Sequence, residues 1–440
     1  MMLAAMSNYF MMFVDRIILS RYSPDAFVAA ASAHTYYWAA TRAMMAFVIM
    51  TSVFISQYHG ARNYRPIGSI VWQTLFISLC YYIFLIPMSL FSRELLSPTV
   101  RDIGAPYLSI ILLFLPLHLM GFGAISAFFL GIGKTKIVPT VIVISNVANI
   151  VLDIILINGY CGFPELGARG AAYATGISQV LALFIFLYEF LKRPYRIYYG
   201  THIPKISWSM IKKTLPYGIP NSINSVLNSG GFAIVNQIIA TVCSSEDLLA
   251  FSIANSIYMF FWFFSDGLGK GICTISANYI GNNQIRNISG VSKSTMKIIA
   301  LFAIFTALFM VCAPKLMLSL FYGDEVSATF FNRFRVVLFW TWIALIIDAF
   351  RWMTQNILIA AKDVQFTVVS NISCFWIAAF LPIYIFVHVL RIGGAVFCWQ
   401  CFILDSFCRI VSNRFRLHSK TWQKKAHRAA HASQRNKDQR

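Results

Sequence analysis

Two aspartates lie inside long apolar stretches of this 440-residue sequence: Asp15 in MMFVDRIILS and Asp153 in SNVANIVLDIILI. Asn146, Asn149 and Asp153 are spaced i, i+3 and i+7, so one face of a helix carries all three. Carboxylate and amide oxygens suit hard cations such as Na⁺. A carboxyl group taken out of water also holds a proton more readily. The stripe is therefore a candidate cation or proton site, and the alternative is a structural cluster of hydrogen bonds between helices.

The composition indicates that these residues sit in a membrane protein. The chain is 58% hydrophobic and 12% charged, whereas soluble domains carry about 25% charged residues. Apolar runs of about 20 residues, the length that crosses a bilayer, recur along the sequence. We predict an all-α polytopic protein of about twelve transmembrane helices, at 3–20, 27–57, 68–91, 105–131, 137–158, 168–191, 217–242, 248–279, 295–319, 334–360, 364–388 and 392–412.

The distribution of basic residues predicts the orientation of these helices. The net charge is +20, but the lysines and arginines cluster in every second connection, which is typical of cytoplasmic loops and not of nucleic-acid binding. We therefore expect a multi-pass protein of the cell inner membrane with a cytoplasmic C-terminus. Residues 413–440 form a basic tail, which we expect to be disordered and to lie near anionic lipid headgroups.

The two halves of the chain look like copies of one plan. Aligning Gly60 with Gly281 also superimposes Tyr58 on Tyr279, and LGIGKT at 130–135 resembles LIAAKD at 358–363. We predict two pseudo-symmetric six-helix lobes with a polar linker and the basic tail, at 1–191, 214–412, 192–213 and 413–440. Parallel repeats of this kind occur in transporters, with the binding site between the repeats.

Other charged residues within the predicted spans have nearby partners. Asp348 precedes Arg351 by three residues, and Asp266 precedes Lys270 by four, spacings at which helical side chains meet. We expect Asp266 and Lys270 to form a structural pair, whereas Asp348 is either a site candidate of the second half or is neutralised by Arg351.

The second predicted span carries a further group of polar and aromatic residues. His34 and Arg42 either face a cleft or reach the membrane surface. Tyr37 belongs to an aromatic cluster that suits organic cations through cation–π contact, although such rings also pack against lipid and neighbouring helices.

The chain resembles the multidrug and toxic compound extrusion (MATE) family over essentially its whole length. Each motif is weak alone, but their order is specific. The motifs are Val14-Asp15, Gln57-Tyr58-His59-Gly60-Ala61, Gly131-Ile132-Gly133-Lys134-Thr135, Asn149-Ile150-Val151-Leu152-Asp153 and Leu166-Gly167-Ala168-Arg169-Gly170-Ala171-Ala172-Tyr173-Ala174-Thr175.

The resemblance implies a V-shaped pair of lobes that exports organic, cationic or amphipathic compounds by alternating access, in exchange for H⁺ or Na⁺. It implies a monomer with a small-molecule substrate, membrane lipid around it and no cofactor. The amino-terminal lobe of the family carries a cation site, which is a metal site only if Na⁺ is the coupling ion. The matching positions are Asp15, Asn149, Asp153 and Thr175.

The carboxyl-terminal lobe departs from the NorM-type pattern of the family. Asp348 matches the aspartate of span ten in that subfamily, but the glutamate of its span seven appears here as Asn228. Only fourteen residues precede Asp15, so either the natural start lies upstream or the first helix is short. We therefore expect the cation site in the first lobe, with Asp348, Asn228, Tyr37 and Arg42 as second-lobe or substrate-cleft candidates.

Two other classes of function compete with an antiporter. A flippase for a lipid-linked saccharide or cell-wall precursor has a related paired-lobe plan but needs a cationic cleft, for which Arg42 is the candidate. An intramembrane enzyme needs a catalytic motif such as HExxH, which the sequence lacks. We therefore expect a protein that is not an enzyme.

Overall fold

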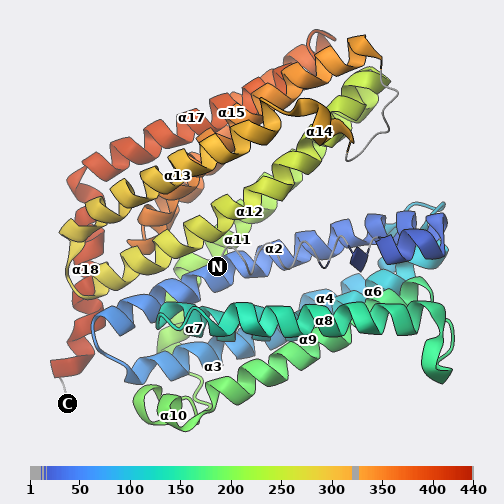
Figure 1. Cartoon of the computed structure of the whole chain (residues 1–440). Coiled ribbons are helices and arrows are strands. Elements are labelled where there is room, and N and C mark those ends of the chain that lie inside the picture. Colours follow the sequence, from blue (N-terminus) through green and yellow to red (C-terminus); the bar gives the residue numbers. More distant parts are fainter. Residues whose placement is uncertain (1–10, 12–13, 16, 320–326, 439–440) are drawn as a thin grey trace. The chain divides into compact units, whose positions relative to one another are not determined.

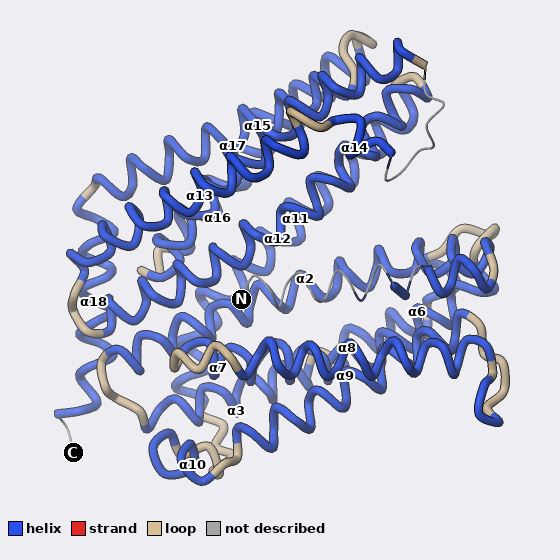
Figure 2. The backbone as a smooth tube through the Cα atoms, in the orientation of Figure 1, coloured by secondary structure: helices blue, strands red, loops and turns tan. Residues whose placement is uncertain are grey.

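The computed structural model describes residues 11, 14–15, 17–319 and 327–438, and every regular element among them is a helix (Figure 1, Figure 2). Contacts divide these residues into two compact units. Unit 1 takes in the described residues up to Ser222 and those from Ala432 onward, and unit 2 runs from Ile223 to His431. The divisions fall inside two helices, α11 (Trp208–Val242) and α18 (Lys420–Asp438), whereas the sequence placed the boundary in the polar segment 192–213.

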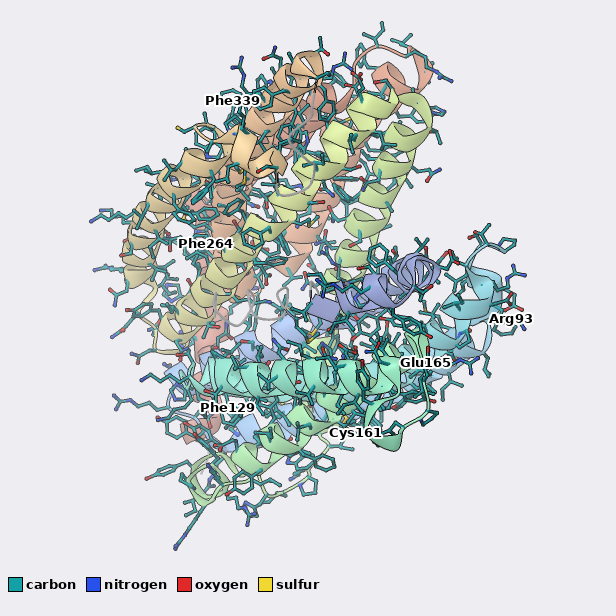
Figure 3. All side chains as sticks on the ribbon, turned by 45° about the vertical axis from the view of Figure 1, so that its right-hand side comes forward. Arg93, Phe129, Cys161, Glu165, Phe264 and Phe339 are labelled. Carbon is teal, nitrogen blue, oxygen red and sulfur yellow. The ribbon has the colours of Figure 1, made fainter. Side chains whose placement is uncertain are left out.

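Unit 1 is a helical bundle whose apolar side chains form two buried clusters. Its elements, including a π-helical turn, η1, and a 3₁₀ turn, η2, are α2 (Pro24–Gly60), α3 (Arg65–Cys80), α4 (Tyr82–Leu90), α5 (Ser92–Leu95), α6 (Arg101–His118), η1 (Leu119–Ile125), α7 (Ser126–Gly131), α8 (Ile137–Asn158), η2 (Tyr160–Gly162), α9 (Ala168–Phe190), α10 (Arg193–Tyr199) and the start of α11 (Trp208–Val242). Glu165 and Cys161 lie in the loop that joins α8 to α9 (Figure 3).

Unit 2 is a second bundle, around one buried apolar cluster. After α11 its elements, with a 3₁₀ turn, η3, and two π-helical turns, η4 and η5, are α12 (Ser245–Gly281), η3 (Ile285–Asn287), α13 (Ile288–Met310), α14 (Pro314–Ser319), α15 (Ala328–Ala360), α16 (Val364–Cys374), η4 (Phe375–Phe380), η5 (Ile383–Val389), α17 (Ala395–His418) and α18 (Lys420–Asp438).

Ten helices of the described residues are long and apolar enough to cross a membrane. They match ten of the predicted spans. Most of the predicted first span, 3–20, lies outside the described residues, and the seventh corresponds to α11, whose Pro216 and Pro220 accompany several asparagines. The fold is an all-α polytopic membrane protein built as two bundles.

The long helices α2 and α12 begin and end alike, as expected for repeats. Each has 37 residues. Ser23 and Ser244 cap them: each hydroxyl accepts a hydrogen bond from the backbone N–H three residues on, at 3.3 and 3.2 Å. Such caps satisfy an otherwise unpaired donor. Each helix ends at the glycine that the sequence alignment matched, Gly60 or Gly281.

The turns that follow α2 and α12 repeat as well, and so do those that follow α7 and α15. Arg62 and Asn283 have φ of 56° and 57°, and Gly133 and Lys362 have φ of 79° and 60°. The sequence had matched Lys134 with Lys362, but the backbone instead matches Gly133 with Lys362, one residue earlier. The residue after each of these four donates its backbone N–H to a carbonyl five residues back, and this pattern defines the turn better than the identity of its side chains.

Two predicted segments differ from the structure. We expected one span at 295–319, but α13 ends at Met310 and the short helix α14 begins at Pro314. Proline lacks the N–H that would continue the helix and restricts the residue before it.

The basic tail is helical where we expected disorder, because its charges have partners. α17 runs to His418 and α18 follows from Lys420. Asp363, in the turn before α16, accepts Arg416 Nε at 2.7 Å and Lys425 Nζ at 2.6 Å. Trp422, Ala426, Ala429, Ala430 and Ser433 form the buried face of α18.

Candidate functional site

The polar stripe of α8 faces the interior of unit 1. Asn149 and Asp153 are completely buried, and Asn146 is 7% exposed. On the opposite face, Val147 and Val151 are about half exposed, at 57% and 50%. In a membrane protein the exposed valines face lipid and the polar face lies against protein. The prediction that these three polar residues share one inward face is confirmed.

Asp15, Asn149 and Thr175 come together although they lie on three separate segments. The hydrogen-bonding pattern orients the Asn149 amide with its nitrogen toward Asp15, to which it donates at 2.9 Å from Oδ1. The Asn149 oxygen then accepts the backbone N–H of Thr175, at 3.3 Å. Asn149 therefore presents a donor, and not an oxygen ligand, to the carboxyl group.

Asp153 lies beside Asp15. Neither carboxyl oxygen of Asp153 has a hydrogen-bond donor among the described residues. An ionised carboxylate only accepts, so a hydrogen bond between two carboxyl groups requires one of them to hold a proton. Two like charges in a buried site strongly disfavour each other. The pair is therefore a place where a proton or another cation relieves an unfavourable contact.

A small cavity opens onto Asp15 and Thr175 from the side of α2 and α6. The space inside it that the centre of a water molecule can occupy has a volume of about 40 Å³. His34 and Tyr107 line the cavity together with apolar residues. That volume suffices for at least one water. The Tyr107 hydroxyl lies 3.5 Å from His34 Nδ1. The aspartate pair is thus connected to a space in which water or an ion can be held.

Tyr37 and Arg42 lie outside the cavity beside the aspartate pair. Tyr37 is 5% exposed, and its hydroxyl accepts a hydrogen bond from Gln179 Nε2 at 3.2 Å, inside unit 1. Arg42 is half-buried, and its guanidinium carbon lies 5.9 Å from the centre of the Trp38 ring. Neither residue lines the cavity beside Asp15.

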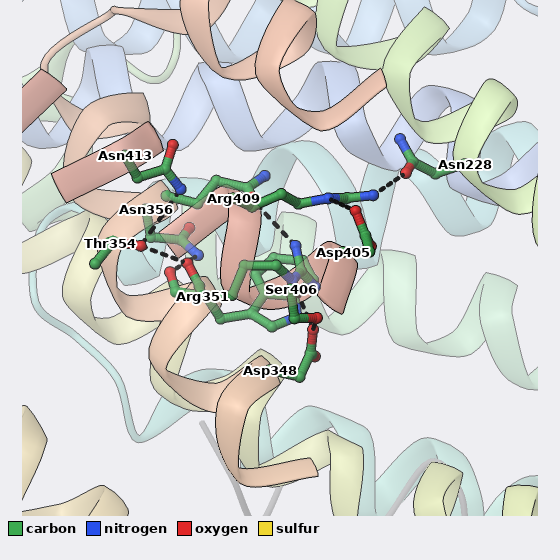
Figure 4. Close-up of polar contacts among 11 residues, drawn as sticks. Asn228, Asp348, Arg351, Thr354, Asn356, Asp405, Ser406, Arg409 and Asn413 are labelled. Atoms are coloured by element: carbon green, nitrogen blue, oxygen red, sulfur yellow. Dashed lines mark hydrogen bonds and ion pairs between the residues drawn. The ribbon is translucent and has the colours of Figure 1, made fainter. Parts of the chain in front are cut away.

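The second-unit candidates lie in a separate polar network (Figure 4). Asp348 accepts Arg351 Nε at 2.6 Å, and the hydroxyl of Ser406 lies 3.5 Å from the same oxygen. Asn228 Oδ1 accepts Arg409 Nη2 at 3.1 Å, and Arg409 Nε also donates to Asp405 Oδ1 at 2.6 Å. Each aspartate of this network is therefore neutralised by an arginine of its own helix.

The structure contains both ion pairs that the sequence suggested. Of the two alternatives for Asp348, it shows pairing with Arg351. Lys270 Nζ lies 2.6 Å from Asp266 Oδ2, so these residues form the expected i, i+4 pair on α12.

Sequence reasoning missed several members of both networks. Asp405 and Arg409 obey the same i, i+4 rule and lie in a predicted span, so that rule applied to every span finds them. Tyr107 and Gln179 carry no such signal, because their partners lie on other helices.

Two bundles of apolar helices with buried carboxylates are typical of membrane transporters. A family model described as MatE matches residues 1–155 and 220–385, most of the chain. The chain therefore belongs to this family, the multidrug and toxic compound extrusion transporters, and is a multi-pass transporter of the multidrug-efflux class. The family match does not favour the flippase alternative.

Individual relatives agree with this assignment. The probable multidrug resistance protein NorM of Thermotoga maritima is 26% identical over 320 residues, which cover 70% of this chain and 68% of that protein. The uncharacterized transporter YisQ of Bacillus subtilis is 25% identical, with 94% of this chain and 91% of that protein covered.

Solved structures support the fold. An outward-facing multidrug resistance MATE family transporter of the MOP superfamily superimposes with a TM-score of 0.84 at 20% identity, with 95% of this chain and 93% of that chain covered. A MOP superfamily transporter from Pyrococcus furiosus gives a TM-score of 0.83 at 20% identity, covering 94% and 93% of the two chains.

Proposed function

We propose that this protein exports organic cationic or amphipathic compounds across the inner membrane in exchange for a cation that binds at Asp15 and Asp153. The observation that carries this proposal is that Asp15, which Asn149 holds at 2.9 Å beside a cavity, shares its site in unit 1 with the completely buried Asp153, one turn after Asn149 on α8. One bound cation removes the repulsion between them, and its loss restores it. The cation-bound and cation-free states of the aspartate pair differ by a full charge. A difference of this kind can couple cation binding to substrate binding.

The coupling ion that best suits this arrangement is the proton. A proton needs only the two carboxyl groups, whereas Na⁺ seeks several oxygen ligands. The Asn149 oxygen already accepts the Thr175 N–H, and its nitrogen faces Asp15. Na⁺ coupling would require Asn149 to turn over, so that its oxygen joins Asp15, Asp153 and Thr175 as a ligand.

Export follows if substrate and proton favour opposite states of the transporter. A proton entering from outside removes one of the two negative charges of the aspartate pair, and this singly charged form releases the substrate and returns. The doubly charged form, after proton release to the cytoplasm, binds substrate again. Alternating access of this kind requires only that each ligand has a different affinity for the two states.

Proteoliposomes test the proposal directly. The purified protein is reconstituted, an organic cation such as ethidium is loaded, and transport is followed under an imposed pH gradient or an imposed Na⁺ gradient. We expect transport under the pH gradient, and its loss in D15N and D153N. Asp102, an exposed residue that pairs with Arg93, provides the matched control D102N. Transport by D153N at the wild-type rate would refute the assignment of the site.

We also propose a cytoplasmic C-terminus and a monomeric protein. The basic connections support the orientation. In a variant without the nine native cysteines, single cysteines introduced at the exposed Arg65 and Arg93, which lie at opposite ends of the predicted third span, should react with impermeant reagents from opposite sides of the membrane. Light scattering of the purified protein measures the mass, and a dimer mass would overturn the second point.

A further inference from the structure

Two arginine side chains of unit 2 occupy positions that resemble cation sites. Arg351 lies in an oxygen set made of one carboxylate and one carboxamide: Nε is 2.6 Å from Asp348 Oδ1 and Nη1 is 2.9 Å from Gln355 Oε1. Arg409 meets the same combination, with Nε 2.6 Å from Asp405 Oδ1 and Nη2 3.1 Å from Asn228 Oδ1. Figure 4 shows Arg409 reaching Asp405 and Asn228.

Both ion pairs are buried, one on α15 and the other on α17. Their side chains are between 6% and 11% exposed, so water contributes little to the solvation of these charges. Such pairs give little net stability compared with apolar residues of the same size. The loss of one partner is different, because it leaves a charge without compensation in a dry environment.

More oxygen atoms lie around Arg351 than accept hydrogen bonds from its guanidinium group. Asp348 Oδ2 has no hydrogen-bond partner, although the residue is only 5% exposed. The Ser406 hydroxyl lies 3.5 Å from Asp348 Oδ1, and the Tyr258 hydroxyl lies beside the same carboxyl group. Two carboxylate oxygens, one amide oxygen and two hydroxyls are a ligand set of the kind that hard cations accept.

We propose that Arg351 and Arg409 are resident cations in two preformed cation sites of unit 2. Guanidinium is not deprotonated in proteins, so these positive charges stay in place. Unit 2 then exchanges no coupling ion, and each site accepts Na⁺ only when its arginine is replaced by a neutral side chain. This inference concerns a different part of the molecule from the aspartate pair of unit 1 and does not depend on it.

The test measures Na⁺ binding in the full-length protein, not transport. R351M and R409M are made in wild type and in D153N, which silences the unit 1 site. Thermal unfolding in detergent is recorded against NaCl, with choline chloride at equal ionic strength as reference. We expect each single variant to gain a Na⁺-dependent rise in Tm, with an apparent affinity for Na⁺ at least about tenfold tighter than that of its parent. The reason is that the aspartate of the site keeps its negative charge after its arginine has been removed. The gain should be larger in R351M, whose site has more oxygens.

Two controls separate a cation site from general destabilisation. R333M removes an arginine from an exposed ion pair with Glu246 and should gain no Na⁺ effect. The double variant D348N/R351M removes both charges and should lose the gain seen in R351M. R351K keeps the resident charge and should behave as wild type toward Na⁺.

The results decide the proposal in either direction. The same Na⁺ response in parent and in both single variants, or no response in any of them, would overturn it. If the arginine variants do not fold, D348N tests the pair from the other side. Its unpaired guanidinium should make Tm depend on chloride against gluconate, and no such dependence would also refute the pairing.

Discussion

The two units share a backbone plan but place their charged residues on different helices. In unit 1 the polar stripe lies on α8, where Asn149 and Asp153 are buried. Counting from the matched turns at Gly133 and Lys362, the same positions of unit 2 are Ala378 and Pro382. Unit 2 instead carries its two most buried ion pairs between side chains of one helix on α15 and α17. The repeat therefore fixes the architecture and leaves the chemistry of each half free to diverge.

The matched tyrosines show how one position serves both arrangements. Tyr37 and Tyr258 are equally distant from the glycines that end α2 and α12. The Tyr37 hydroxyl accepts from Gln179, a neutral side chain. The Tyr258 hydroxyl lies beside the Asp348 carboxyl group. The difference between the units is thus the presence of an arginine for every buried aspartate of the unit 2 network, and a contact between two carboxyl groups in unit 1.

The largest effect on stability is expected where a buried arginine is removed. R409M leaves Asp405 charged and unpaired, which typically costs about 3–5 kcal/mol. Chemical or thermal unfolding of the purified protein measures the loss. A loss below about 1 kcal/mol would mean that the buried pair resembles an exposed one and would remove the contrast between the units.

D153N should change the stability of the protein little and its transport activity strongly. It removes one of two neighbouring acids, so we expect the unfolding free energy to stay within about 1 kcal/mol of wild type. Transport driven by a pH gradient should fall by about a hundredfold, within the range of coupling energies between sites. Transport rate and unfolding are measured on the same preparation. A strongly destabilised D153N with intact transport would reverse the roles assigned to the two units.

Asp363 extends the comparison to a paired carboxylate outside the spans. Burial raises the pKa of Asp363, but hydrogen bonds from Arg416 and Lys425 outweigh it and hold the pKa below its ordinary value. The stabilisation is therefore complete above about pH 4, the ordinary value, and disappears as the pH falls through the lowered pKa. D363N should remove it at every pH, at a cost of about 1.5–3 kcal/mol for hydrogen bonds to charged groups.

The docking of α18 provides the readout for Asp363. Limited proteolysis should cut D363N between His418 and Ala432 faster than wild type, and wild type should approach the same rate in acid. Equal rates for the two proteins at neutral pH would show that the buried face of α18 holds the helix in place without the ion pairs.

The smallest effect is expected at the exposed pair of Arg333. Its guanidinium lies 3.3 Å from Glu246 Oε2, with both side chains about half exposed. Exposed pairs contribute at most about 1 kcal/mol, so R333M should change the unfolding free energy by less than that. A change as large as that of R409M would show that burial does not govern these ion pairs.

Much of the fold was predictable, because the local composition of the sequence indicates which segments form membrane helices. Apolar runs, basic connections and the repeat around Gly60 and Gly281 indicated the helices and the two bundles. The misplaced end of α13 and the helical tail have different causes. The helix break before Pro314 comes from the backbone of that residue, which average hydropathy does not register. The tail is ordered by a partner for Arg416 on a distant turn, a contact between separate segments.

The sequence by itself determined the helical periodicity that puts Asn149 and Asp153 on one face, and the i, i+4 spacing that pairs Asp266 with Lys270. Both are properties of one helix. Only the tertiary structure decided that Asp15 meets Asp153 and that Arg409 reaches Asn228. Those contacts join separate helices, and their existence depends on packing angles and depths that no local pattern encodes.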